Sequence, residues 1–174
     1  MKKILVTLLG SAFFMSCSSV PTIETVGKVD IKRFMGTWYV IGNIPTFIEK
    51  GAHNAIESYQ LKDDGTIATT FTFYKKAFDG PKKTYNPRGF IRDRKNNAVW
   101  DMQFFWPLKS EFLIIYLDSE YKHTVIGRSK RDYVWIMSRT PSIPEEEYNS
   151  ILGLLKKAGY DVTKIQKVPQ RWDE

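Results

Sequence analysis

The sequence predicts an all-β domain with one C-terminal helix, built as an eight-stranded antiparallel up-and-down β-barrel. Between residues 36 and 139 the chain consists of short β-rich runs separated by turn signals, and several runs alternate large apolar with polar residues. Beyond residue 139 the apolar residues change to helical spacing. The chain has 174 residues, of which 43% are hydrophobic, so it is long enough for one domain with a sizeable core.

The first residues are typical of an export signal. Lys2 and Lys3 precede an apolar run at 4–15, which is too short to cross a bilayer because a spanning helix takes about 20 apolar residues. Ser16-Cys17 follows, and residues 14–17 resemble the cleavage box of bacterial lipoproteins. We therefore predict a signal peptide at 1–16. The alternative is an ordinary secretory signal with an incidental cysteine.

Cys17 is the only cysteine in the chain, so an internal disulfide is excluded and the fold must rely on its core. Acylation would give this thiol a use, because several buried acyl chains anchor a protein to a membrane far better than one. Ser18 follows it, without an acidic retention signal, which favours the outer membrane. We expect residues 17–28 to form a tether.

The strands are expected where β-favouring residues gather between turns. Asp63-Asp64-Gly65 is a strong turn signal between two of them. The expected strands lie at 36–43, 52–61, 66–74, 89–92, 98–105, 112–117, 124–128 and 133–138.

Alternation indicates which side chains face the interior. Trp100, Met102 and Phe104 share one face of their run, and Trp135 shares a face with Met137 in the same way. In a closed sheet one face points inward, so these side chains either fill the barrel or line a cavity in it. The sequence leaves that choice open.

The C-terminal part predicts one helix packed against the outside of the barrel. Ser142 and Glu145 have the spacing of a capping box, and Gly159 is placed to end the helix. The residues between them with helical spacing are Tyr148, Ile151, Leu152, Leu155 and Ala158. Residues 160–168 are expected to add a short edge strand, and the polar tail at 169–174 is expected to be loose.

The formal net charge is +7, and its basic residues gather in stretches that resemble turns. They are Lys75-Lys76, Lys82-Lys83, Arg88 and residues 92–95. A solvated rim is the simplest interpretation, and a surface that meets anionic lipid headgroups is the alternative. No nucleic-acid reader motif is present, so nucleic acid is not an expected partner.

Catalysis and metal binding find little support. The chain has no Gly-x-Ser-x-Gly elbow, no His-Glu-x-x-His and no phosphate-binding loop. Ser129-Lys130 suggests a serine–lysine pair only superficially, because it lies in an expected hairpin turn. The two histidines, His53 and His123, are far apart in sequence, so we expect no metal site and no cofactor. A haem or enzymatic barrel stays the least favoured alternative.

Four ordered motifs resemble those of the lipocalin family, in its apolipoprotein D and bacterial branch. Residues 30–39 resemble the opening turn and Gly-x-Trp motif, and residues 44–51 the loop that follows the first strand. Residues 118–121 occupy the place of the second motif, and residues 132–141, with Arg139, resemble the third. The resemblance covers residues 29–168.

This resemblance implies a structural role for three residues. Trp38 would plug the closed end of the barrel, and Arg139 would lie across its indole, a contact that contributes about 0.5–2 kcal/mol. Gly36 would allow close packing of the backbone near this plug.

The resemblance also implies an apolar pocket opening at the other end, for a fatty acid or a lysophospholipid. The ligand-binding residues it implies are Phe34, Tyr59, Phe71, Phe104, Phe112, Trp135 and Met137, and the parity of the strand adds Trp100 and Met102. For each of them the alternative is a core residue without ligand contact, and for the protein it is a structural envelope protein with a filled barrel. Phe47 and residues 105–107 would form an apolar lip at the mouth. The sequence leaves open whether the protein forms a homodimer.

Overall fold

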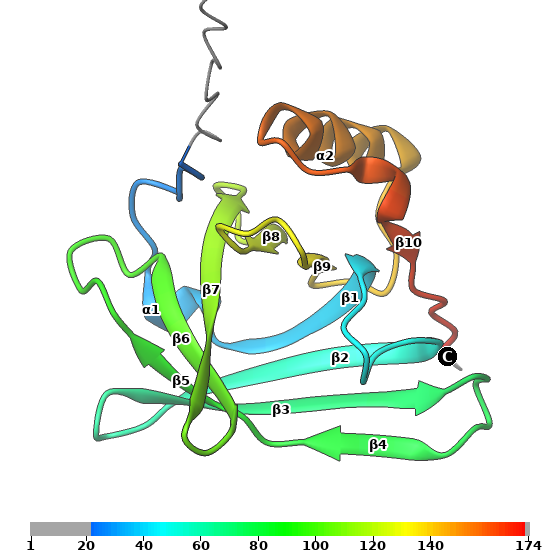
Figure 1. The fold of residues 1–174 in the computed structure, drawn as a ribbon, viewed down its shortest axis with the longest axis horizontal. Coiled ribbons are helices and arrows are strands. Elements are labelled where there is room, and N and C mark those ends of the chain that lie inside the picture. The colour runs from blue at the N-terminus through cyan, green and yellow to red at the C-terminus, as the bar shows by residue number, and fades with distance from the viewer. Residues whose placement is uncertain (1–21, 173–174) are drawn as a thin grey trace, which may run out of the picture.

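The barrel closes because its first strand pairs with its last. The computed structural model describes residues 22–172, and within this range all strands form one antiparallel sheet (Figure 1). Neighbouring strands pair in the order β1, β2, β3, β5, β6, β7, β8, β9, and β9 then pairs with β1. These strands are β1 (Gly36–Ile44), β2 (Ala52–Leu61), β3 (Thr66–Lys75), β5 (Arg88–Ile91), β6 (Val99–Phe105), β7 (Leu108–Leu117), β8 (His123–Gly127) and β9 (Val134–Ser138).

One of the eight barrel strands is broken into two parts. β4 (Lys82–Tyr85) pairs with the end of β3, and β5 pairs with its beginning. Asn86-Pro87 separates them, and proline has no N–H to donate to a strand ladder. If β4 and β5 are taken as one strand, the described residues form the predicted eight-stranded barrel.

Two predictions for the barrel strands were wrong. Lys82-Lys83 was expected in a turn but lies in β4, and β7 begins at Leu108 instead of residue 112. The other barrel strands begin and end within one residue of the expected positions, whereas the edge strand expected at 160–168 covers only β10 (Gln166–Lys167). Both missed segments are largely solvent-exposed at residues 82–84 and 108–109 and therefore lack the apolar alternation that identifies a strand.

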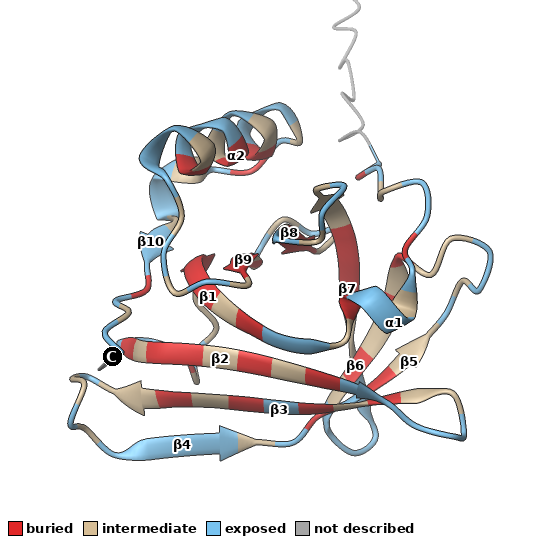
Figure 2. Cartoon of the chain, turned by 180° about the vertical axis from the view of Figure 1, so that it is seen from behind, coloured by how far each residue is buried: buried red, intermediate tan, exposed pale blue. Residues whose placement is uncertain are grey.

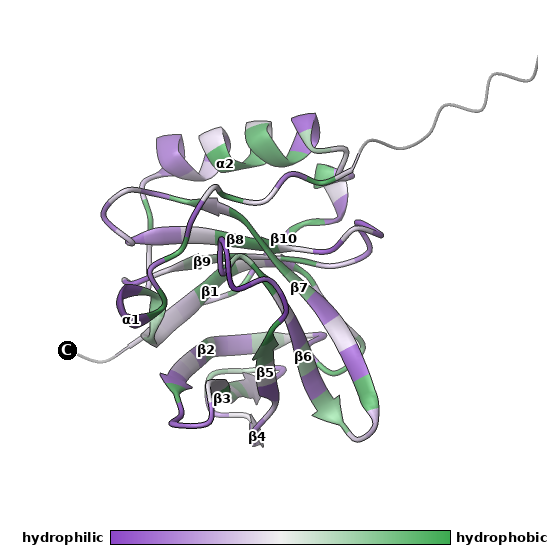
Figure 3. Ribbon diagram, turned by 90° about the vertical axis from the view of Figure 1, so that its left-hand side faces the viewer, coloured by the Kyte–Doolittle hydropathy of each residue, from purple (hydrophilic) through white to green (hydrophobic). Residues whose placement is uncertain are grey.

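The predicted helix is α2 (Glu145–Lys157), which packs its apolar stripe on the outside of the barrel (Figure 3). Tyr148, Ile151 and Leu155 are its buried residues. The predicted capping box is wrong: Pro144 is the N-cap and makes no side-chain hydrogen bond, and three glutamates in the first turn complement the helix dipole instead. Gly159 follows the helix with a φ of +87°, a conformation in which glycine carries no Cβ penalty.

Both ends of the described chain are fastened to the barrel. Ile23 is buried, and the Val26 N–H donates to the Ile114 carbonyl at 3.0 Å, so residues 23–26 of the expected tether contact the barrel. The expectation of a loose tail after Pro169 is wrong up to Trp172. Its Gln170 side chain donates to the Val40 carbonyl at 2.8 Å, and Arg171 exchanges two hydrogen bonds with the Asn54 side chain. The short 3₁₀ turn η1 (Val162–Lys164) and edge strand β10 (Gln166–Lys167) lead to this tail.

The barrel has two apolar cores, one on each face of its sheet. The inner core fills much of the barrel, and the alternation of buried and more exposed residues along β2 and β3 marks its wall (Figure 2). The outer core lies between α2 and the outward-facing side chains of β1, β7, β8 and β9. Every buried residue of both cores lies between residues 23 and 168, so a chain that begins at Ser18 contains the whole barrel.

The predicted signal peptide at 1–16 and Cys17 lie outside the described residues. Within residues 22–172, no helix is long and apolar enough to pass through a membrane.

Candidate ligand-binding pocket

The closed end of the barrel is plugged by aromatic rings. Asp30 is the N-cap of α1 (Ile31–Phe34), and its carboxylate accepts from the Lys32 and Arg33 N–H groups. This turn places Phe34 in the barrel. The Phe34 ring lies 5.2 Å from that of Trp38 and 5.4 Å from that of Trp100, between centroids. Such pairs contribute about 0.5–1.5 kcal/mol each beyond their burial, so the plug is a rigid base for the barrel.

Arg139 covers this plug from outside. Its guanidinium carbon lies 3.7 Å from the centre of the Trp38 ring. The guanidinium also donates to the main-chain carbonyls of Arg33, Phe34, Met35, Thr37 and Tyr121. Burial lowers the pKa of Arg139 to about 10, so the group is still charged at neutral pH. Arg139 and Trp38 thus pack against each other at the plug, and neither of them lines the inner or the outer hollow.

Gly36 serves this end through its backbone conformation. Its φ is +92°, in the region that L side chains rarely adopt, and an added Cβ would come no closer than 3.5 Å to Arg139. The expectation of close backbone packing at Gly36 is thus wrong: the positive φ, and not a lack of space, requires glycine.

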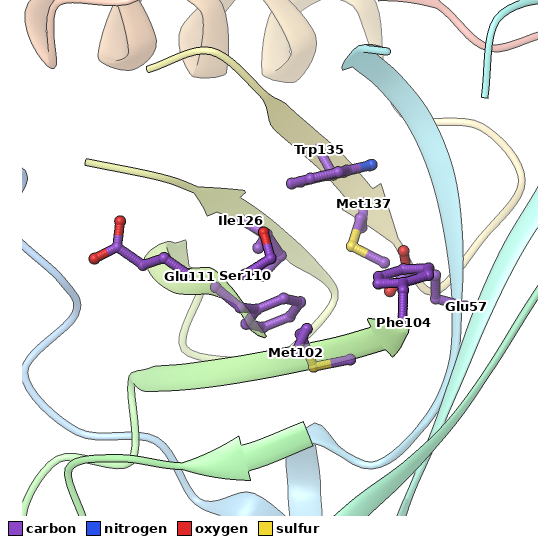
Figure 4. Close-up of a pocket in the computed structure, with 9 residues that line it drawn as sticks. Glu57, Met102, Phe104, Ser110, Glu111, Ile126, Trp135 and Met137 are labelled. Atoms are coloured by element: carbon purple, nitrogen blue, oxygen red, sulfur yellow. The ribbon is translucent and has the colours of Figure 1, made fainter. Parts of the chain in front are cut away.

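The cavity begins above the plug as a small inner hollow of about 30 Å³ (Figure 4). A wider outer hollow of about 220 Å³ reaches the mouth, and the two share Met102, Phe104, Ser110 and Trp135 as wall residues. The inner hollow is lined by Glu57, Met102, Phe104, Ser110, Glu111, Phe112, Ile126, Trp135 and Met137. Carbon and sulfur atoms predominate on this wall, as in other sites for apolar ligands.

The nine predicted binding residues divide between cavity wall and packed core. Met102, Phe104, Phe112, Trp135 and Met137 line the cavity. Phe34, Tyr59, Phe71 and Trp100 line neither hollow. Phe34, Tyr59 and Trp100 belong to the plug, whereas Phe71 packs against Phe73 and Tyr85. The parity of a strand shows which side chains point inward but not how deep they lie, so it groups plug and wall residues together.

Sequence reasoning missed a buried acidic group in the inner hollow. Glu57 is 7% exposed, and Tyr59 donates a hydrogen bond to one oxygen of its carboxylate. Burial, with a smaller contribution from the charge of Glu49, raises the pKa of Glu57 to about 7, although the Tyr59 hydrogen bond opposes the rise. The sequence did contain an indication of this site. Glu57 lies two residues before Tyr59 in the same strand, so both side chains point into the barrel, and a charged residue at such a position is rarely buried without a partner.

Glu49 is a second buried acid, in the loop between β1 and β2. One of its oxygens accepts from the Trp135 indole at 2.8 Å, and the other accepts from the Thr46 N–H and hydroxyl, both at 2.9 Å. Burial raises its pKa, and these donors oppose the rise. Glu49 therefore fixes the ring of Trp135 against the cavity.

Cationic and apolar side chains surround the mouth. Lys109 and Arg128 line the outer hollow, together with Phe47, Phe105 and Leu108. Phe47 is 76% exposed and Trp106, in the hairpin between β6 and β7, is 86% exposed. The ends of β6 and β7 that meet at this hairpin are coloured hydrophobic in Figure 3. The mouth thus combines an apolar lip with positive charge.

Among residues 22–172, no three His, Cys, Asp or Glu side chains are arranged to hold a metal ion. The Ser129 hydroxyl lies 3.1 Å from a Glu111 oxygen and bonds to it in an exposed turn.

Residues 29–170 match the sequence profile of the family described as "Lipocalin-like domain". The chain belongs to the lipocalin family. Outer membrane lipoprotein Blc of Citrobacter freundii is 32% identical to this lipocalin over 169 residues, which cover 95% of each chain. The Blc protein of Escherichia coli K12 is 31% identical over 180 residues, which cover 95% of this chain and 96% of that one.

More distant relatives place this lipocalin in the branch of Blc and apolipoprotein D. Apolipoprotein D of Mus musculus is 27% identical over 183 residues, and the alignment covers 88% of that protein. Insecticyanin from the tobacco hornworm Manduca sexta has a similar solved structure, with a TM-score of 0.67 and 16% identity. That alignment covers 90% of this lipocalin and 87% of insecticyanin, and it shows a shared fold.

Proposed function

We propose that this lipocalin binds a single-chain lipid, a fatty acid or lysophospholipid, and stores or transports it in the cell envelope without catalysing a reaction. The observation that carries the proposal is an apolar cavity that runs from the inner hollow to a mouth with exposed aromatic and basic residues. Each buried methylene contributes about 0.8 kcal/mol, so an acyl chain gains affinity there without specific contacts.

The headgroup would lie at the mouth. Lys109 and Arg128 both line the outer hollow, and the side chain of Arg128 is only 17% exposed. Its guanidinium pairs with Asp132 at 3.3 Å, and its Nε atom is buried without a hydrogen-bond partner in the described structure. A phosphate or carboxylate would be attracted to these two cations.

The location we propose is the outer membrane, with an acylated Cys17 as the anchor. Two relatives with about 31% identity are named outer membrane lipoproteins, and they match over nearly the whole chain. The exposed lip of Phe47 and Trp106 would suit transfer of a lipid from a bilayer, because aromatic rings favour the membrane–water interface.

A filled structural barrel is the second candidate, and the size of the inner hollow favours it. About 30 Å³ is far below the roughly 300–1,000 Å³ of most ligand sites, and the outer hollow of about 220 Å³ also falls short. Lipid binding therefore requires side chains to move. Met102 and Met137 are suited to this because unbranched thioether side chains adapt readily.

Titration separates the two candidates. The chain from Ser18 onward would be analysed by native mass spectrometry for bound lipid and then titrated with oleic acid and an oleoyl lysophospholipid, with tryptophan emission as the signal. Ser110→Trp fills the wall shared by both hollows, and Ser150→Trp, on the exposed side of α2, is the matched control. One saturable site that Ser110→Trp removes and Ser150→Trp keeps would support lipid binding. A folded parent protein without saturable binding would support the filled barrel.

The anchor has its own test. Cells that express the full chain would be grown with labelled palmitate, and the label should appear in the parent protein but not in Cys17→Ser. Equal labelling of the two proteins would contradict acylation at Cys17.

A further inference from the structure

The inner hollow contains a carboxyl group whose hydrogen-bonding capacity is only partly used. Glu57 lies on β2 and is only 7% exposed. It faces the sulfur and aromatic groups of the hollow (Figure 4). Tyr59 donates to one oxygen, and no cation of residues 22–172 is among the groups that shift the pKa of Glu57. An isolated ionised carboxylate in an apolar setting is unfavourable, so the site favours a group that brings positive charge or donors.

The surrounding charged groups do not supply that charge. Glu49, the next acid, has both oxygens bonded to Thr46 and Trp135. The Glu111 side chain points away from the other labelled residues in Figure 4 and bonds to Ser129. Lys109 lies 4.0 Å from the centre of the Phe90 ring, and Arg128 pairs with Asp132 beside the Tyr133 ring, both at the outer hollow. The inner hollow therefore contains the Glu57 carboxylate and, among the described residues, no cation in its wall, whereas Lys109 and Arg128 line the outer hollow together with Glu49.

The size of the inner hollow limits what can bind there. A water-sized group needs a cavity volume of at least about 10–15 Å³. A hollow of about 30 Å³ therefore accepts a small headgroup such as an ammonium group but not an alkyl chain. The outer hollow of about 220 Å³ is the larger part, and it would take a chain once its side chains move. A carboxylate head placed inside would meet the Glu57 carboxylate, and neither Lys109 nor Arg128 lines this hollow.

We propose that the inner hollow binds the protonated amine of a single-chain amphiphile, with Glu57 as its counter-ion and the alkyl chain in the outer hollow. This inference deepens the proposed function and rests on its premise that the barrel holds an apolar chain. An ammonium group offers three N–H donors, and the second Glu57 oxygen is free to accept one of them.

The pH dependence of binding distinguishes an amine from a neutral chain. Because burial raises the pKa of Glu57 to about 7, the empty site is partly protonated at neutral pH. An ammonium group favours the ionised form, so amine affinity rises as pH increases from about 5 to 8. A neutral chain desolvates Glu57 further and favours the protonated form, so its affinity falls over the same range.

The test uses three ligands with the same chain: decylamine, decanol and decanoic acid. They would be titrated calorimetrically into the chain from Ser18 onward, at pH 5.5 and pH 8. At pH 8 we expect decylamine to bind at least tenfold more tightly than decanol, and Glu57→Gln to remove most of that preference. Glu146→Gln, on the exposed face of α2, removes the same charge from the surface and should change nothing. Near-UV circular dichroism would verify that each variant is folded.

The outcomes separate this inference from the proposed function. If decylamine binds no better than decanol, if decanoic acid is preferred, or if Glu57→Gln keeps the preference, the amine site is wrong while chain binding stands. If the folded parent protein binds none of the three and no lysophospholipid, both proposals are wrong.

Discussion

Replacement of Glu57 by glutamine should change how the stability of this lipocalin depends on pH. The substitution keeps the shape of the side chain and an acceptor for the Tyr59 hydroxyl, but it removes the charge. It therefore isolates the free energy of burying an ionised carboxylate in the barrel without opening a cavity.

The magnitude follows from the pKa of Glu57, which burial raises from its ordinary 4.5 to about 7. A folded state with the higher pKa binds the proton more tightly than the unfolded chain does, so ionisation destabilises the fold as pH rises between these two values. At about 1.4 kcal/mol per pH unit, the loss above pH 7 is about 3 kcal/mol, and it is absent below pH 4.5. Glu57→Gln has no carboxyl group at this position, so its free energy of unfolding does not show this decrease.

Urea unfolding of both proteins at pH values from 4.5 to 8.5 measures the effect. The free energy of unfolding of Glu57→Gln, minus that of the parent, should increase by about 3 kcal/mol across this range, with most of the change between pH 5 and 7.5. Glu146→Gln should give a flat difference. A flat difference for Glu57→Gln would show that its carboxyl group titrates normally and would refute the reasoning.

Three further predictions concern the plug and the wall. Arg139→Ala should lower the free energy of unfolding by about 3 kcal/mol, because it removes the contact with Trp38 and leaves several carbonyls without a donor; a loss below about 1 kcal/mol in urea unfolding would contradict this role. Gly36→Ala should cost about 1–2 kcal/mol because of its positive φ, whereas Gly27→Ala, with open space and no such constraint, should be neutral; equal losses would argue against strain. Trp100→Ala should lower the free energy of unfolding by about 3–5 kcal/mol, because Trp100 is fully buried in the plug. Phe104→Ala, at a residue that is 37% exposed, should lower it by about 1 kcal/mol or less and should weaken lysophospholipid binding in the emission titration. A larger loss of stability for Phe104→Ala than for Trp100→Ala would contradict the assignment of Trp100 to the plug and Phe104 to the cavity wall.

The location of the cavity could be predicted only in part. Met102 and Phe104 share the parity of Trp100, and all three were expected to line the pocket. Trp100 instead stacks on Phe112 at 4.9 Å and lies in the plug, two residues closer to the closed end than Met102. Depth along the barrel depends on the tilt and register of neighbouring strands, which no single strand's pattern contains.

The environment of Glu57 could also be predicted only in part. Its inward parity was visible in the sequence, but the absence of a counter-ion depends on which side chains the opposite strands bring to the same depth. Burial of a charge and its pKa are therefore properties of the assembled barrel.

The all-β barrel and the outer helix could be predicted from the residue pattern, and the resemblance to the lipocalin family added the contact between Trp38 and Arg139. These features depend on local patterns: a two-residue period for strands, a period of 3.6 for α2, and motifs around Trp38 and Arg139. The boundary between packed core and cavity, the hydrogen bonds of Asn54 and Val40 to the C-terminal tail, and the position of Glu57 in an apolar hollow could be learned only from the folded barrel. Closure of the sheet brings distant strands together, so the space left between their side chains depends on all of them at once.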